Sequence, residues 1–268
     1  MSNRRSHKKH TAGASRAAIL LSAAGVLSAC AAGPEGQFIT EVVPLQTALN
    51  DQKTQSMLRV ADSVNQQGDT DSAIAIYGRI LHDKPQSSQA NASVGQVLLA
   101  RGDSMQALEF FRKALDLEPT AASYVGAGQA LLEKNEPVTA KGYFEKALEL
   151  EPENVTALNG LGVAMDSVGD HAQAQEVYQR ALKISPENKP VRNNYGLSLA
   201  LSKNHAGALA VLGPLANENS DFGRKARQNL VVSYTISGDL ESAVRLARVD
   251  VKNDEDIRND LRVFSMIR

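Results

Sequence analysis

The chain has 268 residues, of which 43% are hydrophobic and 22% charged, a composition typical of folded proteins and unlike that of disordered or collagen-like chains. It contains no tryptophan and only 4% aromatic residues, which favours helical repeats over one large aromatic core. Five of the 29 basic residues lie in residues 1–29, which contain no acidic residue. The rest of the chain has 24 basic and 30 acidic residues, so its formal charge is −6. This mildly acidic body excludes the basic surface and stacking platforms of nucleic-acid binders, so we expect no nucleic-acid partner.

Residues 1–29 have the organisation of a signal peptide. A basic stretch precedes residues 17–29, an apolar run that is too short to span a membrane as a helix but has the length of a signal-peptide core. The run is followed by Cys30, which is the only cysteine of the chain, so no intramolecular disulfide can form. We therefore predict that the protein is exported.

The residues at the end of this run, Leu27, Ser28, Ala29 and Cys30, resemble the lipobox of bacterial lipoproteins. The resemblance implies that the Cys30 thiolate accepts a diacylglyceryl group, that Cys30 becomes the mature N-terminus and that its amino group is then acylated. The protein is therefore expected to incorporate labelled palmitate. An ordinary cleaved signal or an inert cysteine is the alternative. Ala31 stands where an Asp would retain a lipoprotein in the inner membrane by the enterobacterial rule, so we expect a stable lipid anchor in the outer membrane, facing the periplasm.

From residue 54 the sequence repeats itself about every 34 residues. Gly-Asp pairs begin at Gly68, Gly102, Gly169 and Gly238; alanines recur at Ala73, Ala107, Ala140, Ala174, Ala208 and Ala243; aromatic residues follow at Tyr77, Phe111, Phe144 and Tyr178; and prolines end the first four units at Pro85, Pro119, Pro152 and Pro186. This pattern resembles the tetratricopeptide repeat. The resemblance implies an all-α, right-handed superhelical solenoid of about six repeats over residues 54–250. Small residues would let helix A of each unit approach helix B, and the aromatic residue would fill the space toward the next unit.

The fifth unit departs from the repeat pattern. Lys203 stands where a glycine would turn the chain, and Leu212 replaces the aromatic residue. Gly213 and Pro214 follow, and they are expected to break the second helix early. We therefore predict a local irregularity in this unit.

The segments that flank the repeats have different roles. Residues 30–53 are predicted to be the lipidated N-terminus and a tether. At the other end, residues 251–268 are predicted to form a helix that caps the solenoid, with a frayed tail as the alternative. One face of that helix would carry Ile257, Leu261, Phe264 and Ile267.

The body offers little catalytic chemistry. Its histidines are His82, His171 and His205, and the last two occupy the same position in neighbouring units. A metal pair there would need further cysteine or carboxylate ligands, so we expect solvated surface histidines, no metal and no cofactor. No nucleophile elbow or phosphate loop is present. The Gly-x-Gly pair of Gly126 and Gly128 falls inside a repeat helix and is therefore not expected to form a phosphate-binding loop. The sequence therefore predicts that the protein is not an enzyme.

The first helices of the repeats carry a row of carboxamides, which both donate and accept hydrogen bonds as a peptide backbone requires. This amide row consists of Gln96, Gln129, Asn159, Asn193, Asn194, Gln228 and Asn229. We expect it to line a concave, partner-binding face, away from the repeat interfaces, with Leu99, Val125, Leu132, Val163 and Leu197 seating side chains of a bound protein segment. Simple solvation of an exposed helix face is the alternative. Gln173, Gln175 and Gln179 are expected to lie on the opposite, convex side.

Several features together resemble the TadD lipoproteins of Flp/Tad pilus assembly: the length, the lipobox, the six repeats and the stretches at residues 225–230 and 246–248. That resemblance implies an outer-membrane-anchored, pilotin-like scaffold that acts on the secretin or its accessory proteins. The alternative is a repeat lipoprotein that serves peptidoglycan synthesis or outer-membrane protein assembly.

Overall fold

The structure, a computed structural model, describes residues 42–251 of the chain. The chain divides into two compact units, Met1–Asn50 and Asp51–Arg268, and the contacts reported below all lie within the second. The predicted signal peptide, the lipobox with Cys30, the tether up to residue 41 and the capping helix from residue 252 lie outside the described residues.

Twelve helices and no strand make up the described part of the chain, which confirms the all-α class. They are α1 (Val42–Gln66), α2 (Thr70–Asp83), α3 (Ser88–Ala100), α4 (Ser104–Leu117), α5 (Ala121–Glu133), α6 (Pro137–Leu150), α7 (Val155–Ser167), α8 (His171–Ile184), α9 (Lys189–Leu201), α10 (His205–Ala216), α11 (Asp221–Ser237) and α12 (Leu240–Ala247). The first helix begins earlier than expected: residues 42–53, assigned to the tether from their sequence, belong to α1. Pro44 does not prevent this, because a proline is tolerated in the first turn of a helix.

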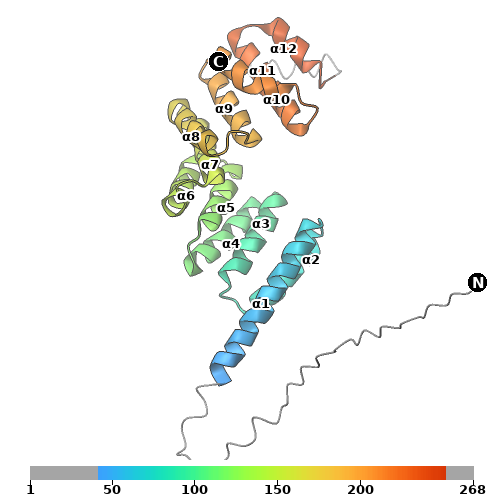
Figure 1. Ribbon diagram of the computed structural model, residues 1–268, viewed down its shortest axis with the longest axis vertical. Helices are drawn as coiled ribbons and strands as arrows, with labels where there is room; N and C mark the ends of the chain where they lie inside the picture. The colour runs from blue at the N-terminus through green and yellow to red at the C-terminus, as the bar shows by residue number, and fades with distance from the viewer. Residues whose placement is uncertain (1–41, 252–268) are drawn as a thin grey trace, which may run out of the picture. The chain divides into compact units, whose positions relative to one another are not determined.

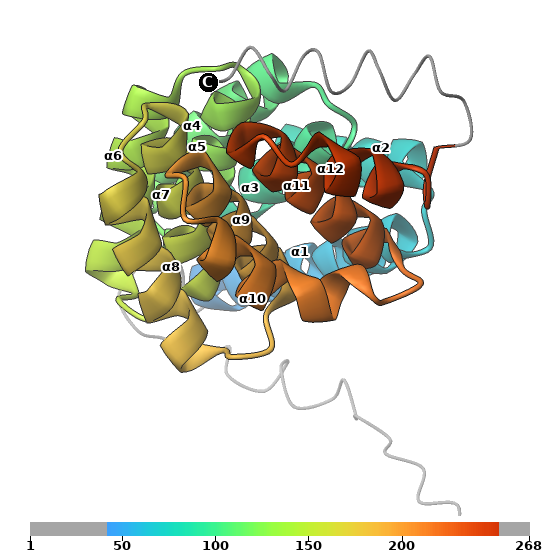
Figure 2. The same ribbon diagram turned by 90° about the horizontal axis from the view of Figure 1, so that it is seen from above.

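The helices form six consecutive pairs, one for each predicted repeat (Figure 1). From α3 onward each first helix packs against the second helix of its own unit, and each second helix packs against the first helix of the next unit. The first helices also contact one another in a row, α3 with α5, α5 with α7, α7 with α9 and α9 with α11. Figure 2 shows α6 and α8 beside the row of α5, α7 and α9. This is the stacking of a repeat solenoid, in which each unit contacts mainly its neighbours.

The turn between the two helices of a unit needs a left-handed residue. Gly68 has φ +88° and Gly102 has φ +84°, a region that costs glycine nothing because it has no Cβ. The aspartate that follows can cap the second helix, as Asp69 does by accepting a hydrogen bond from the backbone N–H of Ser72 at 3.1 Å. Lys203 makes the same turn with φ +65°, so the fifth unit keeps the turn without its glycine.

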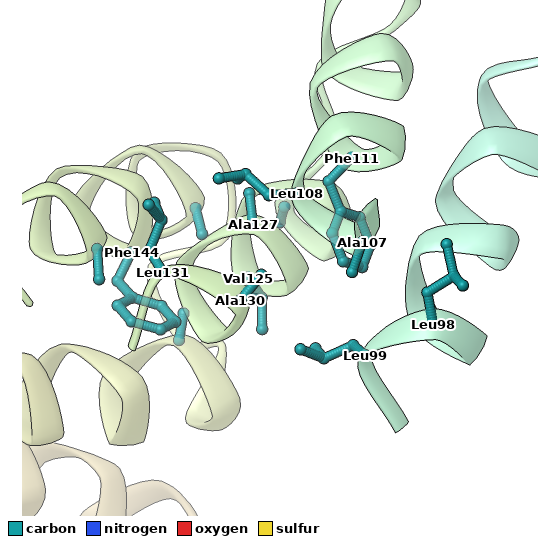
Figure 3. Close-up of a cluster of buried hydrophobic side chains, with 14 of the residues drawn as sticks. Leu98, Leu99, Ala107, Leu108, Phe111, Val125, Ala127, Ala130, Leu131 and Phe144 are labelled. Atoms are coloured by element: carbon teal, nitrogen blue, oxygen red, sulfur yellow. The ribbon is translucent and has the colours of Figure 1, made fainter. Parts of the chain in front are cut away.

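Each buried aromatic ring lies between two first helices. A Cβ atom built on Gly95 of α3 would lie 3.0 Å from Cε1 of Phe111, and one built on Gly126 of α5 would lie 2.3 Å from Cζ of the same ring. Phe111 and Phe144 are 1% and 0% exposed, and Figure 3 shows them with Ala127, Ala130 and Leu131 of α5 in the same cluster. The predicted role of the aromatic residue as a filler between units is confirmed.

The fifth unit is shortened but not broken. We expected Gly213 and Pro214 to end its second helix, but α10 continues through Pro214 to Ala216. Proline removes only one backbone hydrogen bond near the end of the helix, and Leu212 and Leu215 on either side of it are buried. The hydrophobic core does change here: one cluster extends from Leu58 to Val191, whereas Leu199, Ala200 and Ala208 form a second cluster and Leu212, Leu215, Ala226 and Leu230 a third.

Candidate protein-binding surface

The asparagines of the amide row pair with one another across three successive first helices. Asn194 of α9 donates from Nδ2 to Oδ1 of Asn159 on α7 at 3.0 Å. Asn229 of α11 donates from Nδ2 to Oδ1 of Asn193 on α9 at 3.0 Å. The two adjacent asparagines of α9 thus reach in opposite directions, one to the unit before and one to the unit after.

This pairing corrects the expectation that these side chains lie away from the repeat interfaces. All four asparagines are half-buried, and their hydrogen bonds join the fourth, fifth and sixth units. Gln96 and Gln228 are exposed and Gln129 is half-buried. The asparagines therefore have a structural role in addition to any role in binding, and the exposed glutamines are the members of the row that can be changed with least effect on stability.

The amide pairs keep hydrogen-bonding capacity after they have paired. In the first pair, Asn159 uses a carbonyl oxygen and retains its N–H donors, whereas Asn194 uses an N–H and retains its carbonyl oxygen. The second pair, Asn193 and Asn229, has the same arrangement. Each pair can therefore offer a donor and an acceptor, which is what the backbone of a bound protein segment needs.

The apolar residues expected beside the amide row divide into two groups. Leu99 and Val125 are each 7% exposed and belong to the hydrophobic core, so the expectation that they seat partner side chains is wrong. Both side chains belong to the main hydrophobic cluster of the repeats. Leu132, Val163 and Leu197 are half-buried and can contact a bound segment.

A half-buried polar cluster centred on Asp166 joins the fourth unit to the fifth. The Asp166 carboxylate of α7 accepts a hydrogen bond from the Ser198 hydroxyl of α9 at 2.7 Å and from the Tyr178 hydroxyl of α8 at 3.0 Å. Its Oδ1 atom lies 2.8 Å from Nδ1 of His171. Burial, and then the negative charge of Asp166, raise the pKa of Tyr178 well above its usual value.

This cluster corrects the view of the two histidines as solvated surface residues. The His171 side chain is 25% exposed and engages Asp166, and His205 is half-buried with Nδ1 3.2 Å from the hydroxyl of Ser233 on α11. The two rings thus have separate partners and do not form a pair. Within residues 42–251, no three His, Cys, Asp or Glu side chains come together in a group that could hold a metal ion.

Two of the three glutamines expected on the convex side form hydrogen bonds with the next unit. Gln175 donates to the Ser202 hydroxyl at 2.9 Å, and Gln179 donates to the Tyr195 hydroxyl at 2.9 Å. Only Gln173 remains exposed without such a bond, so it is the suitable control position on α8.

The final unit is held by Arg227 of α11. Its guanidinium donates from Nε and Nη2 to the two carboxylate oxygens of Asp250 at 2.8 and 2.7 Å, and from Nη1 to the carbonyl oxygen of Ala216 at 2.7 Å. The hydrogen bonds with Asp250 raise the pKa of Arg227 above its usual value. This bidentate pair fixes the residues after α12 beside the end of α10.

None of the helices in residues 42–251 combines the length and the apolar character needed to cross a membrane.

Stacked helix pairs with a hydrogen-bonding row on their first helices define a repeat scaffold for protein–protein interaction. Residues 61–122, 125–188 and 166–212 match the tetratricopeptide repeat family. These matches span more than half of the chain, and the chain belongs to that family.

Solved structures of other repeat proteins share this fold. PilW, described as a widely conserved type IV pilus biogenesis factor, is similar with a TM-score of 0.68 and 18% identity over 78% of this chain and 99% of PilW. PilF of Pseudomonas aeruginosa gives a TM-score of 0.65 and 18% identity over 82% of this chain and 99% of PilF. YrrB, described as having an unusual peptide-binding site, gives a TM-score of 0.50 and 24% identity over 71% of this chain and 94% of YrrB. Among curated protein sequences, none matches this chain.

Proposed function

We propose that the protein is a lipid-anchored scaffold of the outer membrane that binds a protein segment along its amide row during Flp/Tad pilus assembly, as a TadD-type lipoprotein. The observation that carries the binding role is the pair of asparagine bonds, Asn159 with Asn194 and Asn193 with Asn229. They place further donors and acceptors side by side on three successive first helices, α7, α9 and α11. A backbone segment that crosses those helices can satisfy them and in turn satisfy its own polar groups.

The chemistry of the row favours an uncharged partner segment. None of its seven members is ionisable, and the neighbouring Val163 and Leu197 are apolar and half-buried. A charged side chain would lose water there without gaining a charged partner. The bound segment is therefore expected to be polar or apolar, and its recognition is expected to depend weakly on salt.

The lipid anchor is proposed from the sequence that ends at Cys30. The run from residue 17 to Ala29 precedes a single cysteine, and several acyl chains on that cysteine would hold the protein stably at the membrane. The residue after it, Ala31, supports the outer membrane. The scaffold would then act from the periplasmic side of that membrane without an enzymatic activity or a cofactor of its own.

The pilus role is proposed from two likenesses. PilW is described as a type IV pilus biogenesis factor, and nearly the whole length of PilW, and of PilF, superposes on this chain. The stretch around Arg227 resembles the TadD lipoproteins, and in the structure that arginine fastens the last unit. The proposed partner is the secretin of the pilus machinery or one of its accessory proteins.

The experiment is a replacement of the gene in its own bacterium. Deletion is expected to abolish surface pili and to deplete assembled secretin from the outer membrane, and the full chain is expected to restore both. Cys30→Ser is expected to take up no labelled palmitate and to restore neither, because a hydroxyl cannot replace the thiolate as the lipid acceptor. Normal pili in the deletion strain, with a defect in peptidoglycan or in outer-membrane protein insertion, would contradict the pilus role. Wild-type protein without palmitate would contradict the anchor.

A further inference from the structure

Two separate hydrogen bonds join the first helices α7 and α9. Asn194 donates to Asn159 in the amide row, and Ser198 donates to Asp166 in the polar cluster at 2.7 Å. Asn159 and Asp166 are seven residues apart on α7, so they share one face of that helix. Asn194 and Ser198 are four residues apart on α9 and likewise share a face. The polar cluster and the amide row therefore belong to one helix–helix contact.

The bond between Asp166 and Ser198 replaces an apolar contact of the preceding units. One repeat earlier, the residues at these two positions are Leu132 on α5 and Ala164 on α7. Ala164 belongs to the main hydrophobic cluster, and Leu132 packs against it. The fourth and fifth units thus meet through a carboxylate and a hydroxyl at the positions where the third and fourth units have aliphatic side chains.

The hydrophobic core is interrupted at the same junction. The buried residues of the main cluster end at Val191, near the start of α9, whereas Leu199 and the residues packed with it form a cluster of their own. Ser198 directly precedes Leu199 and is fully buried. A hydrogen bond fixes the distance and the direction between its two groups. The bond with Asp166 therefore holds α9 against α7 where the continuous core ends.

Asp166 is a half-buried charge that is well supplied with partners. Its side chain is 14% exposed, and its oxygens face the hydroxyls of Ser198 and Tyr178 and Nδ1 of His171. Replacing a paired charge of low exposure by well-packed apolar residues is often neutral for stability or even stabilising. The use of a carboxylate at this position therefore favours a role in fixing one arrangement of the two helices.

We propose that Asp166 is a positioning residue for the amide row. By holding Ser198, it sets how far α9 is rotated and shifted on α7. Asn193 and Asn194 both lie on α9, so the same setting aligns the two asparagine pairs for one bound segment across α7, α9 and α11. This inference rests on the proposed binding by the amide row, but the placement of α9 can be measured without a partner.

An apolar copy of the preceding junction tests the proposal. The apolar variant combines Asp166→Leu, Ser198→Ala and Tyr178→Phe. These are the residue types found one repeat earlier, at Leu132, Ala164 and Phe144. The urea midpoint of the apolar variant is expected to equal or exceed that of the wild-type protein, because no buried hydroxyl or carboxylate is left unpaired.

The distance between two spin labels reports the placement of α9. In the full chain with Cys30→Ser, nitroxide labels are attached at Thr156→Cys on α7 and Gln228→Cys on α11, which are both exposed positions, and pulsed electron resonance measures the distance. We expect the apolar variant to move the mean distance by more than the width of the wild-type distribution.

A matched control removes a similar bond away from the amide row. Asp62→Leu with Tyr77→Phe deletes the tyrosine–aspartate bond of the first unit and is expected to leave the label distance unchanged. In the cell, a photoreactive residue at position 228 measures binding. The apolar variant is expected to give about tenfold less adduct than the wild-type protein, which corresponds to the loss of about two hydrogen bonds to the bound segment.

An unchanged label distance in the folded apolar variant would overturn the proposal, and so would an equal shift in the first-unit control. If the apolar variant does not fold, Ser198→Ala alone takes its place, with the same expected shift and the same contradicting result. Wild-type protein that gives no adduct from position 228 would contradict the proposed function, whereas the label distance would still decide the role of Asp166.

Discussion

Gly160 of α7 lies against the ring of Phe144 on α6, so closely that a Cβ atom on Gly160 would stand 2.3 Å from Cε1 of the ring. Phe144 is fully buried and cannot move aside without shifting its neighbours. We expect Gly160→Ala to lower the free energy of unfolding by about 1 to 3 kcal/mol through overpacking. Urea unfolding followed by circular dichroism measures the change.

Gly142 on α6 is the matched control for this substitution, because a Cβ atom there meets nothing within 4 Å. Gly142→Ala is expected to leave stability unchanged or raise it by up to about 1 kcal/mol, since alanine is the better helix former. Equal effects at Gly142 and Gly160 would contradict the close approach of Gly160 to Phe144.

The left-handed turn at Lys203 predicts a stabilising substitution. Lys203 has φ +65°, a conformation that costs a side-chain-bearing residue about 1 to 2 kcal/mol and glycine nothing. Glycine loses more backbone entropy on folding, so the expected net gain for Lys203→Gly is about 0.5 to 1 kcal/mol. The reverse change at the equivalent turn, Gly169→Ala, is expected to destabilise. A lower melting temperature for Lys203→Gly would contradict this prediction, because it would mean that the Lys203 side chain stabilises the fold by more than its positive φ destabilises it.

The repeat alanine Ala174 is fully buried at the contact of α8 with its neighbours. Ala174→Leu is expected to cost at least about 1 to 3 kcal/mol, because the added carbon atoms have no space and a central unit supports both adjacent units. Ala172→Leu, at an exposed position of the same helix, serves as the control and should have little effect. A thermal melt that does not distinguish the two variants would contradict the packing at Ala174.

Tyr178 predicts a pH dependence at alkaline pH. Burial and the Asp166 charge raise its pKa in the folded protein, whereas the unfolded chain releases the proton near pH 10. The native state therefore keeps a proton that the unfolded state loses, and this contribution to stability is present below pH 10 and declines above it. Tyr178→Phe is expected to cost about 1 kcal/mol at pH 8 through the lost hydrogen bond to Asp166, and the gap to wild type should narrow at pH 11. A constant gap in urea unfolding at the two pH values would contradict the raised pKa.

The repeat architecture could be predicted from the sequence because it depends on local spacing. The alanines, the aromatic residues and the turn glycines recur at fixed intervals, and each has the same physical task in the units where it occurs. Lys203 shows the limit of matching by residue type. It is not a glycine, yet it makes the left-handed turn that its position in the repeat requires.

Contacts between units were harder to predict, because they depend on how far one first helix is rotated against the next. Asn194 faces Asn159 across 35 positions and Asn229 faces Asn193 across 36, a difference that a uniform repeat does not anticipate. The Asp166 cluster did leave a signal. Tyrosine replaces phenylalanine at position 178, where its hydroxyl reaches that carboxylate, and Tyr77 likewise donates to Asp62.

Site-specific photo-crosslinking in the living cell tests the central claim that the amide row binds a partner. A photoreactive residue at Gln228, an exposed member of the row on α11, is compared with one at Gln173, exposed on α8. We predict an adduct with the pilus secretin or one of its accessory proteins from position 228 and none from position 173. Adducts from position 173 alone, or equal adducts from both positions, would contradict the account.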